Sequence, residues 1–206
     1  MDVTPAALIQ RLAAADLAVP ASVARRLLDV LDAARGERQN LTRITDPGDA
    51  LERHLVDSLL SATLPAVRCS GGPIADVGSG IGFPGLALAA LFPDRAVHLI
   101  ESEKRKAGWL ARAAADFPNV RVVSERSEDL ARRHRGEFDL AVARALGPAP
   151  VALELCAPLV GAHGHVILWR SGGDDPAAAD PAAATLGFAP PEICPYAPFP
   201  GAERYY

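Results

Sequence analysis

The spacing of apolar side chains in residues 1–72 is that of helices with one buried face. Thr4 followed by Pro5 is typical of a helix start, because the threonine can cap free amide groups and proline fits the first turn. Gly36 is typical of a helix end. We predict helices over about 4–17, 20–35 and 46–60. They form an N-terminal helical extension, which a glycine-containing linker at 68–73 joins to the rest of the chain.

From residue 74 the pattern changes to short apolar runs that alternate with amphipathic segments. Strands are predicted at 74–77, 96–100, 120–123, 138–143 and 165–170. Helices are predicted at 83–92, 103–116, 125–135 and 148–159. This alternation predicts an α/β fold, a mostly parallel, doubly wound sheet in residues 73–206 with helices on both faces. After Ser171, a low-complexity run of alanine, aspartate and proline predicts a loop or a frayed helix.

The composition is that of an ordinary globular domain, since the 206 residues are 50% hydrophobic and 22% charged. The N-terminus has no positively charged signal segment, and the most apolar stretch, near 85–92, is too short to cross a bilayer. We therefore expect a cytoplasmic protein without a membrane partner. Cys69, Cys156 and Cys194 are widely spaced, which predicts reduced structural thiols. The 5 histidines lack ligand spacing, which predicts no metal site.

The formal net charge of −4 hides a basic segment. Residues 95–135 carry 10 Lys and Arg against 6 Asp and Glu, whereas residues 136–206 carry 3 against 8. The cations cluster at 104–106 and 132–135. A local basic surface can meet phosphate groups whatever the total charge is, and the alternative is a pair of solvated helix faces.

A glycine-rich turn follows the first predicted strand and precedes a helix, and it contains Gly78, Ser79 and Gly80. Glycines at this place permit a tight turn and let a ligand approach the backbone at the carboxyl edge of the sheet. Glu101 ends the second predicted strand, where a carboxylate can accept hydrogen bonds from both hydroxyl groups of an adenosine ribose.

Two cofactor classes fit this layout. A nicotinamide enzyme usually has a G-x-G-x-x-G turn whose helix N-terminus faces the pyrophosphate. Here Asp76 precedes the first glycine, and Phe83-Pro84 occupies the region of the third. An acid beside the loop suits a ligand that bears a cationic amino acid better than it suits a diphosphate. The residues therefore favour S-adenosylmethionine and methyl transfer over NAD and hydride transfer.

Several short motifs occur in an order that is seen in one family. They are Asn40-Leu41-Thr42, Arg53-His54, Asp57-Ser58, Gly82-Phe83-Pro84-Gly85, Glu128 and Val142-Ala143-Arg144-Ala145. Over about residues 25–170 the chain closely resembles the bacterial 16S ribosomal RNA (guanine-N7) methyltransferases, the glucose-inhibited division protein B family. The resemblance implies a class I (Rossmann-like) methyltransferase that methylates a guanine N7 in the 530-loop region of 16S ribosomal RNA, free or in the small ribosomal subunit. We expect a monomer with no DNA partner.

Carried over by position, the resemblance implies roles for single residues. Gly78 and Phe83 contact the cofactor from the loop. Ser127 and Glu128 face the adenine, and Arg144 closes the pocket beside the methionine end. Ser127 stands where the family commonly has a small apolar residue, so we expect its backbone to make the contact.

Guanine N7 carries an in-plane lone pair and no proton, so its methylation needs alignment and exclusion of water rather than a general base. We expect Arg144 and a polar face made by His54, Asp57 and Ser58 to position the base. These three residues lie at i, i+3 and i+4 and share a helix face. Without the resemblance they would predict an ordinary polar face, and their closeness on one helix argues against a nucleophilic triad.

The chain also departs from the family. After the fifth predicted strand, Arg170-Ser171-Gly172 replaces the lysine-glycine that the family often has, and this keeps a cation. The sequence ends at Tyr205-Tyr206, where the family would continue a closing strand, so we expect either that the closing strands are shortened or that the sequence is truncated. The helical spacing of Trp109 favours a place in the core over base stacking. Three other functions stay open at this stage: a small-molecule methyltransferase, a NAD-linked oxidoreductase and a non-catalytic binding module.

Overall fold

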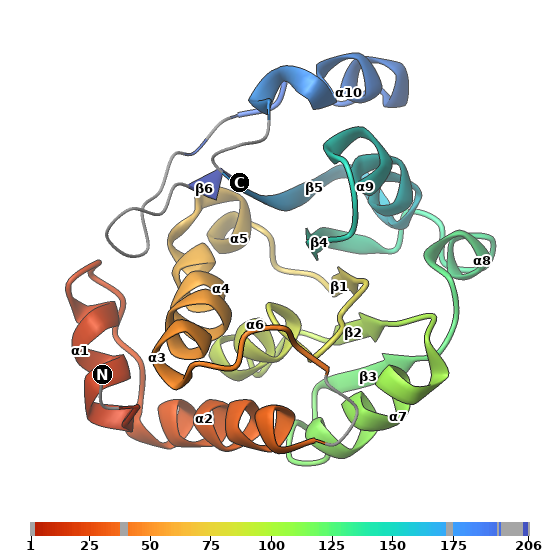
Figure 1. Ribbon diagram of the computed structural model, residues 1–206. Helices are drawn as coiled ribbons and strands as arrows, with labels where there is room; N and C mark the ends of the chain where they lie inside the picture. Colours follow the sequence, from red (N-terminus) through yellow and green to blue (C-terminus); the bar gives the residue numbers. More distant parts are fainter. Residues whose placement is uncertain (1–2, 38–40, 172–174, 193, 195–203, 206) are drawn as a thin grey trace.

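The computed structural model describes residues 3–37, 41–171, 175–192, 194 and 204–205. Within them, six strands form one sheet in the order β3-β2-β1-β4-β5-β6 (Figure 1). The strands are β1 (Ile74–Val77), β2 (Val97–Ile100), β3 (Val120–Val123), β4 (Phe138–Arg144), β5 (Val160–Ser171) and β6 (Arg204–Tyr205). β1 to β5 are parallel, and β6 runs antiparallel to β5. The chain changes direction across the sheet between β1 and β4, and doubly wound sheets bind ligands outside the carboxyl ends of the strands at this point.

Helices precede the sheet and connect its strands, as the hydrophobic pattern predicted. The helical extension contains α1 (Pro5–Ala13), α2 (Ala21–Gly36), α3 (Pro47–Ala50), a π-helical turn (Leu51–Val56), α4 (Asp57–Leu60), a 3₁₀ turn (Ser61–Thr63) and α5 (Pro65–Cys69). The later helices are α6 (Gly85–Leu91), α7 (Lys104–Ala113), α8 (Ser127–Ala131), α9 (Ala149–Cys156), a 3₁₀ turn (Ala157–Leu159), another (Pro176–Ala179) and α10 (Asp180–Leu186). The Thr4 hydroxyl accepts a hydrogen bond from the Ala7 amide at 3.2 Å, which confirms the predicted cap. The predicted α/β fold class is confirmed.

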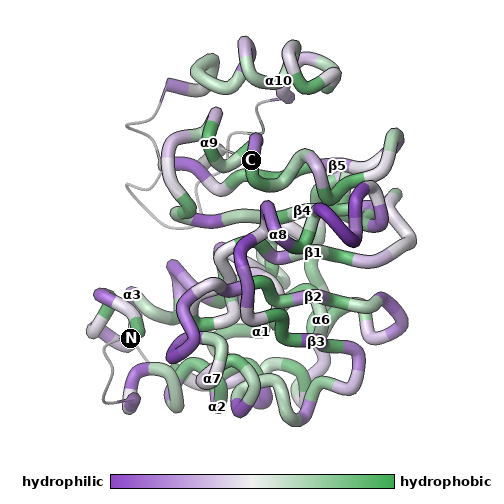
Figure 2. The backbone as a smooth tube through the Cα atoms, turned by 90° about the vertical axis from the view of Figure 1, so that its right-hand side faces the viewer, coloured by the Kyte–Doolittle hydropathy of each residue, from purple (hydrophilic) through white to green (hydrophobic). Residues whose placement is uncertain are grey.

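Each face of the sheet has its own hydrophobic cluster. Ile74 and Leu99 point to the face covered by the extension, α6 and α7, and Ala75 and Ile100 point to the face covered by α8 and α9. Successive strand residues thus point to opposite faces, and both faces are buried, as in most parallel sheets. Figure 2 shows hydrophobic residues concentrated on the strands and inner helices, with hydrophilic segments in the outer turns.

The extension shares the hydrophobic core of the sheet. Leu8 of α1, Leu31 of α2 and Leu59 of α4 belong to the same buried cluster as Leu86 of α6 and Leu140 of β4. All five side chains are almost completely excluded from solvent. Since close-packed cores leave little room for sliding, the extension is held in place relative to the strand ends.

The structure corrects several predicted boundaries. The predicted helix at 46–60 contains a π-helical turn, α8 ends at 131 rather than 135, and the linker at 68–73 begins inside α5. Of the two structures predicted after Ser171, a loop or a helix, the helix is confirmed over 176–186. β5 begins at Val160, five positions before the predicted start, because Val160 pairs with Phe138 of β4. Pairing with a neighbouring strand outweighs the weak strand propensity of Gly161 and Gly164. Residues 172–174, part of the predicted loop, lie outside the described residues.

The start of α6 lies directly against β1 and β2. The Gly85 amide donates a hydrogen bond to Oδ2 of Asp76 at 2.9 Å. A Cβ atom on Gly85 would lie 2.5 Å from Asp76 Oδ2 and would collide with Cδ2 of Leu99. A side chain at this position would therefore push the helix away from the sheet.

Replacing Gly85 by alanine is expected to destabilise the protein by roughly 1–3 kcal/mol, because the extra methyl group overpacks the junction. Gly108 in α7 is the matched control, since nothing lies within 4 Å of a Cβ built there. Gly108→Ala should raise the free energy of unfolding by up to about 1 kcal/mol, the gain in helix propensity. Urea denaturation of the two variants measures both effects. Equal stability of the two variants would contradict this view of the junction.

Candidate active site

The loop between β1 and α6 has a backbone that favours glycine. Gly78, Gly80 and Gly82 have φ values of 71°, 56° and 102°, in the left-handed region where other residues are strained. A Cβ atom on Gly78 would lie 2.5 Å from Cδ1 of Leu146, whereas one on Gly80 would meet only the Gly78 carbonyl oxygen, at 3.8 Å. The loop thus packs tightly against the segment after β4, and beside Gly80 it leaves its backbone accessible to a ligand.

Glu101 fixes the loop to the end of β2. Its Oε2 accepts a hydrogen bond from the Gly80 amide at 3.1 Å, and its Oε1 accepts one from the Glu103 amide at 2.9 Å. Each carboxylate oxygen can accept a further bond. The carboxylate therefore lies where the sequence analysis expected it, at the edge of the sheet beside the glycine loop.

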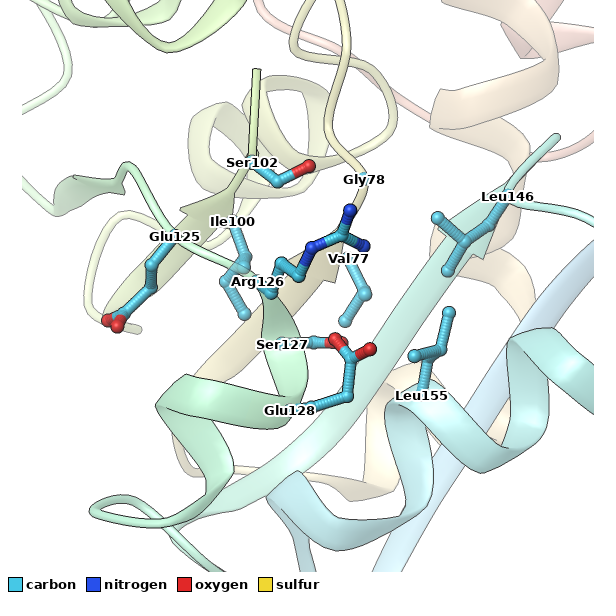
Figure 3. A pocket seen from close by; sticks show the side chains of 10 residues that line it. All are labelled: Val77, Gly78, Ile100, Ser102, Glu125, Arg126, Ser127, Glu128, Leu146 and Leu155. Carbon is cyan, nitrogen blue, oxygen red and sulfur yellow. The ribbon is translucent and has the colours of Figure 1, made fainter. Parts of the chain in front are cut away.

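A cleft opens at the carboxyl ends of β1 to β4, with about 350 Å³ of empty space that is continuous with solvent (Figure 3). Its lining consists of Val77, Gly78, Ile100, Ser102, Glu125, Arg126, Ser127, Glu128, Leu146 and Leu155. The structure therefore brings together Gly78, Ser127 and Glu128, which the resemblance had associated with the cofactor. Arg126, Leu146 and Leu155 were not predicted from the sequence as lining residues. For Arg126, the available indication was its place next to Ser127.

Asp76 and Ser79 lie beneath the loop and do not line this cleft. Both are buried, and the Ser79 hydroxyl donates a hydrogen bond to the Asp76 carbonyl oxygen at 2.8 Å. Burial raises the pKa of Asp76 to about 7, against the effect of the hydrogen bond from Gly85. In this position the two side chains hold the shape of the turn.

Arg144, at the end of β4, joins the loop to the helical extension. Its Nη1 donates hydrogen bonds to the Arg53 carbonyl oxygen at 2.9 Å and to the Ser58 hydroxyl at 3.0 Å. Its Nη2 donates to the Phe83 carbonyl oxygen at 2.9 Å. The guanidinium thus links groups that lie far apart in sequence, and 16% of its side-chain surface remains exposed.

His54 and Asp57 complete this set of contacts. Arg144 Nη1 lies 3.5 Å from Oδ2 of Asp57, and Nη2 lies 3.5 Å from Nδ1 of His54. Because arginine only donates, Nδ1 of His54 is the acceptor, and the ring proton is on Nε2. Nε2 lies 3.0 Å from the hydroxyl of Thr42, which also accepts from the Ile44 amide. This pair connects the Leu41-Thr42 segment to the helix; Asn40 lies outside the described residues.

The His54 ring is neutral at ordinary pH. Burial, followed by the nearby charges of Arg144 and Arg53, lowers its pKa to about 3. A ring that stays neutral and whose Nδ1 faces a guanidinium is unsuited to proton transfer near pH 7.

The helix that carries these residues contains a π-helical turn. Over Leu51–Val56 the backbone forms a π-helical turn, which is wider than an α-helical turn. The Asp57 amide accordingly donates to the carbonyl oxygen of Glu52. The Ser58 hydroxyl donates to the carbonyl oxygen of His54. The carboxylate of Glu52 pairs with Arg11 of α1 at 2.6 Å, which holds the turn against the rest of the extension. Single π-helical turns within α-helices are frequent at functional sites.

Comparison with known proteins identifies the family. Residues 22–186 match the family described as rRNA small subunit methyltransferase G, or GidB. The chain is 40% identical over 169 residues to ribosomal RNA small subunit methyltransferase G of Sorangium cellulosum, an alignment that covers 80% of this chain and 71% of the relative. The chain belongs to the GidB family. The relative of the same name from Synechococcus elongatus is 37% identical over 179 residues, which cover 84% of this chain and 74% of the relative.

Solved structures agree on the fold of this GidB-family chain. A SAM-dependent methyltransferase from Aquifex aeolicus superposes with a TM-score of 0.59 at 13% identity, covering 82% of this chain and 97% of that one. At this identity the likeness shows the fold alone. Membership of a methyltransferase family confirms the predicted cofactor, S-adenosylmethionine, over NAD.

Arg170, near the end of β5 in this GidB-family protein, supports the loop that follows Arg144. Arg170 Nη1 donates a hydrogen bond to the Gly147 carbonyl oxygen at 2.7 Å. Between Arg144 and Leu146, Ala145 has a φ of 55°, a left-handed conformation that is strained for a residue with a side chain. Arg170 therefore holds a turn whose two ends face the polar helix and the cleft.

Acids lie close to both basic clusters of the chain. In the first cluster, Glu103 pairs with Arg105 at 3.2 Å and with Lys106 at 2.9 Å. The cluster at 104–106 forms the first turn of α7, which follows β2 at the same edge of the sheet as the glycine loop. In the second cluster, the ion pairs are Arg132 with Asp129, Arg133 with Glu125 and His134 with Glu137. Since these acids offset much of its charge, the segment does not form one continuous basic surface.

The remaining predictions concern residues outside the site. Trp109 is buried and its Nε1 donates to the Ile81 carbonyl oxygen at 3.4 Å, which confirms its place in the core. In the described ranges, the cysteines are unpaired and no group of His, Cys, Asp and Glu could hold a metal ion. No helix in these ranges is long and apolar enough to span a bilayer.

The buried neutral state of His54 predicts a dependence of stability on pH. The unfolded chain protonates this ring near 6.5, whereas the folded chain protonates it only near 3. The free energy of unfolding is therefore expected to fall as the pH falls through this window, and His54→Gln should remove roughly 2–4 kcal/mol of that fall. Urea denaturation of both proteins across this range measures the difference. Parallel pH profiles would mean that the ring titrates normally in the folded protein.

Proposed function

We propose that this protein methylates N7 of a guanine in the 530-loop region of 16S ribosomal RNA, with S-adenosylmethionine as the methyl donor. Membership of the GidB family supports the reaction and the RNA substrate. One observation of the geometry carries the proposal. Arg144 bonds to the Phe83 carbonyl of the glycine loop and to the Ser58 hydroxyl of the helical extension, so that a fixed cation lies between the two.

The residues around the cleft fit the cofactor. The half-buried Gly80 and the left-handed Gly78, neither of which carries a side chain, would admit a ligand at close range. The Glu101 carboxylate would receive the ribose hydroxyl groups. Ser127 and Glu128 line the end of the cleft that would hold the adenine. When bound, S-adenosylmethionine supplies a methyl group activated by its sulfonium charge.

The state of the polar residues agrees with a reaction that moves no proton at the acceptor atom. N7 of guanine attacks with a lone pair that is already free. His54 is neutral, with Nδ1 facing Arg144, and Asp57 forms an ion pair with the same guanidinium. Catalysis then depends on placing the base correctly and excluding water.

Arg144 is the residue that we assign to the base. A guanidinium donates to acceptor edges of guanine. A bond from Arg144 to O6, made in exchange for one of its present contacts, would leave N7 free to attack. His54, Asp57 and Ser58 are buried, so they act as positioning residues that orient the guanidinium. Groups that are hydrogen-bonded to a metal ligand fix the orientation of that ligand in a similar way.

The RNA substrate requires a surface beyond the base itself. We propose that residues 1–72 form the acceptor side of the site and that residues 73–206 hold the cofactor. The cations at 104–106 lie at the edge of the sheet where the cleft opens, and they would meet phosphate groups of the RNA. The protein would act as a monomer in the cytoplasm.

Transfer of labelled methyl groups to 16S ribosomal RNA and to small ribosomal subunits, followed by mapping of the modified nucleotide, tests the proposal. We expect one labelled guanine in the 530-loop region. Arg144→Lys should lower the rate about 100-fold, because a lysine cannot reproduce the planar set of contacts. Its affinity for S-adenosylhomocysteine should stay within a few-fold of the wild-type value.

Arg132→Ala is the matched control, because Arg132 lies past the end of α8, with 79% of its side chain exposed. It should retain the wild-type rate. Labelling of small molecules but not of ribosomal RNA would indicate a small-molecule methyltransferase, and binding of S-adenosylhomocysteine without any transfer would indicate a binding module. Either result contradicts the proposal.

A further inference from the structure

The walls of the cleft differ in chemical character. Ile100, Leu146 and Leu155 provide apolar surface, whereas Ser102 and Arg126 provide polar groups (Figure 3). No aromatic side chain is among the ten lining residues, all of which the structure describes. A planar nucleobase in this cleft could rest on aliphatic groups, but it would find no ring to stack on.

The side chain of Arg126 forms part of the wall of the cleft. Figure 3 shows the side chain extended across the cleft toward Gly78. The backbone of Arg126 is fixed, because its carbonyl oxygen accepts hydrogen bonds from the amides of Asp129 and Leu130 at the start of α8. The point from which the side chain extends is therefore fixed at the cleft.

The neighbouring acids do not hold this guanidinium. Both carboxylate oxygens of Glu125 accept hydrogen bonds from Arg133, at 2.6 and 2.8 Å. Oε2 of Glu128 accepts a hydrogen bond from the Ser127 hydroxyl at 3.2 Å. Within the described part of the chain, no hydrogen bond or ion pair engages the Arg126 guanidinium. The planar cation is thus available to a ligand that enters the cleft.

We propose that Arg126 stacks on the adenine of the cofactor and takes the place of an aromatic side chain. Adenine would lie between the aliphatic surface of Leu146 and the guanidinium plane of Arg126. Arginine suits this role because its planar, weakly hydrated guanidinium stacks on aromatic faces, where the compact ammonium group of lysine cannot. This inference rests on the proposed cofactor, S-adenosylmethionine, and adds a binding residue to its site.

Titration calorimetry with S-adenosylhomocysteine tests the contact. Arg126→Ala is expected to weaken binding about tenfold, the size of a cation–π contact in a partly desolvated site. Arg126→Lys keeps the charge without the plane and should recover only part of the affinity. Competition by adenosine locates the effect, because adenosine should lose affinity by the same factor. Arg132→Ala removes the same charge away from the cleft and should bind as the wild type does.

Three results would overturn the assignment. They are wild-type affinity in Arg126→Ala, full recovery in Arg126→Lys, and a loss for S-adenosylhomocysteine that adenosine does not share. An error in the proposed function would give a different result: the wild-type protein itself would not bind S-adenosylhomocysteine. Since Arg126 is exposed and lies outside both hydrophobic clusters, the variants are expected to fold, and thermal denaturation checks this.

Discussion

The guanidinium of Arg144 joins segments of the chain that lie far apart in sequence, and the geometry of the site depends on this junction. It donates to the carbonyl oxygens of Arg53 and Phe83 and to the hydroxyl of Ser58. Loss of the guanidinium would leave the part-buried acceptors of Ser58 and Phe83 without this donor, at a cost of up to about 1–3 kcal/mol each. The residue assigned to the substrate is therefore also one that holds the fold together.

The shared core explains why this junction can be rigid. The extension packs on the same cluster as α6 and β4, and Trp169 of β5 donates from Nε1 to the Asp57 carbonyl oxygen at 3.3 Å. On the other side, Arg170 bonds to Gly147 and supports the strained turn at Ala145. Strain of this kind persists only where surrounding contacts determine the backbone, and it is found at sites where geometry matters.

Much of the fold could be predicted from the order of short apolar runs and amphipathic segments, because a parallel sheet needs crossover helices between its strands. The glycine loop could also be predicted, because Gly78 and Gly80 lie between a predicted strand and a predicted helix. The start of β5 could not be predicted, because Val160 joins the sheet by pairing with Phe138. Local strand propensity carries no information about this contact.

The chemistry of the site was only partly predictable. From the motifs we predicted that Arg144, His54 and Ser58 act together to position the base. The structure places them within hydrogen-bond distance of one another. The π-helical turn at Leu51–Val56 could not be predicted from the spacing of apolar residues. It alters which backbone groups are hydrogen-bonded, and the sequence carries no separate signal for this change. Arg126 was missed because an arginine among several others has no distinctive spacing, and its place over the cleft follows from the path of the backbone.

If Ser58 acts through Arg144, the effects of changing the two residues are coupled, and a double-mutant cycle measures this coupling. The measurement is kcat/KM for methyl transfer to 16S ribosomal RNA in the wild type, Ser58→Ala, Arg144→Lys and the double variant. We predict a coupling energy of about 1–2 kcal/mol, since the two side chains are hydrogen-bonded partners and not independent sites. Effects that add to within about 0.5 kcal/mol would show independent action and contradict the account.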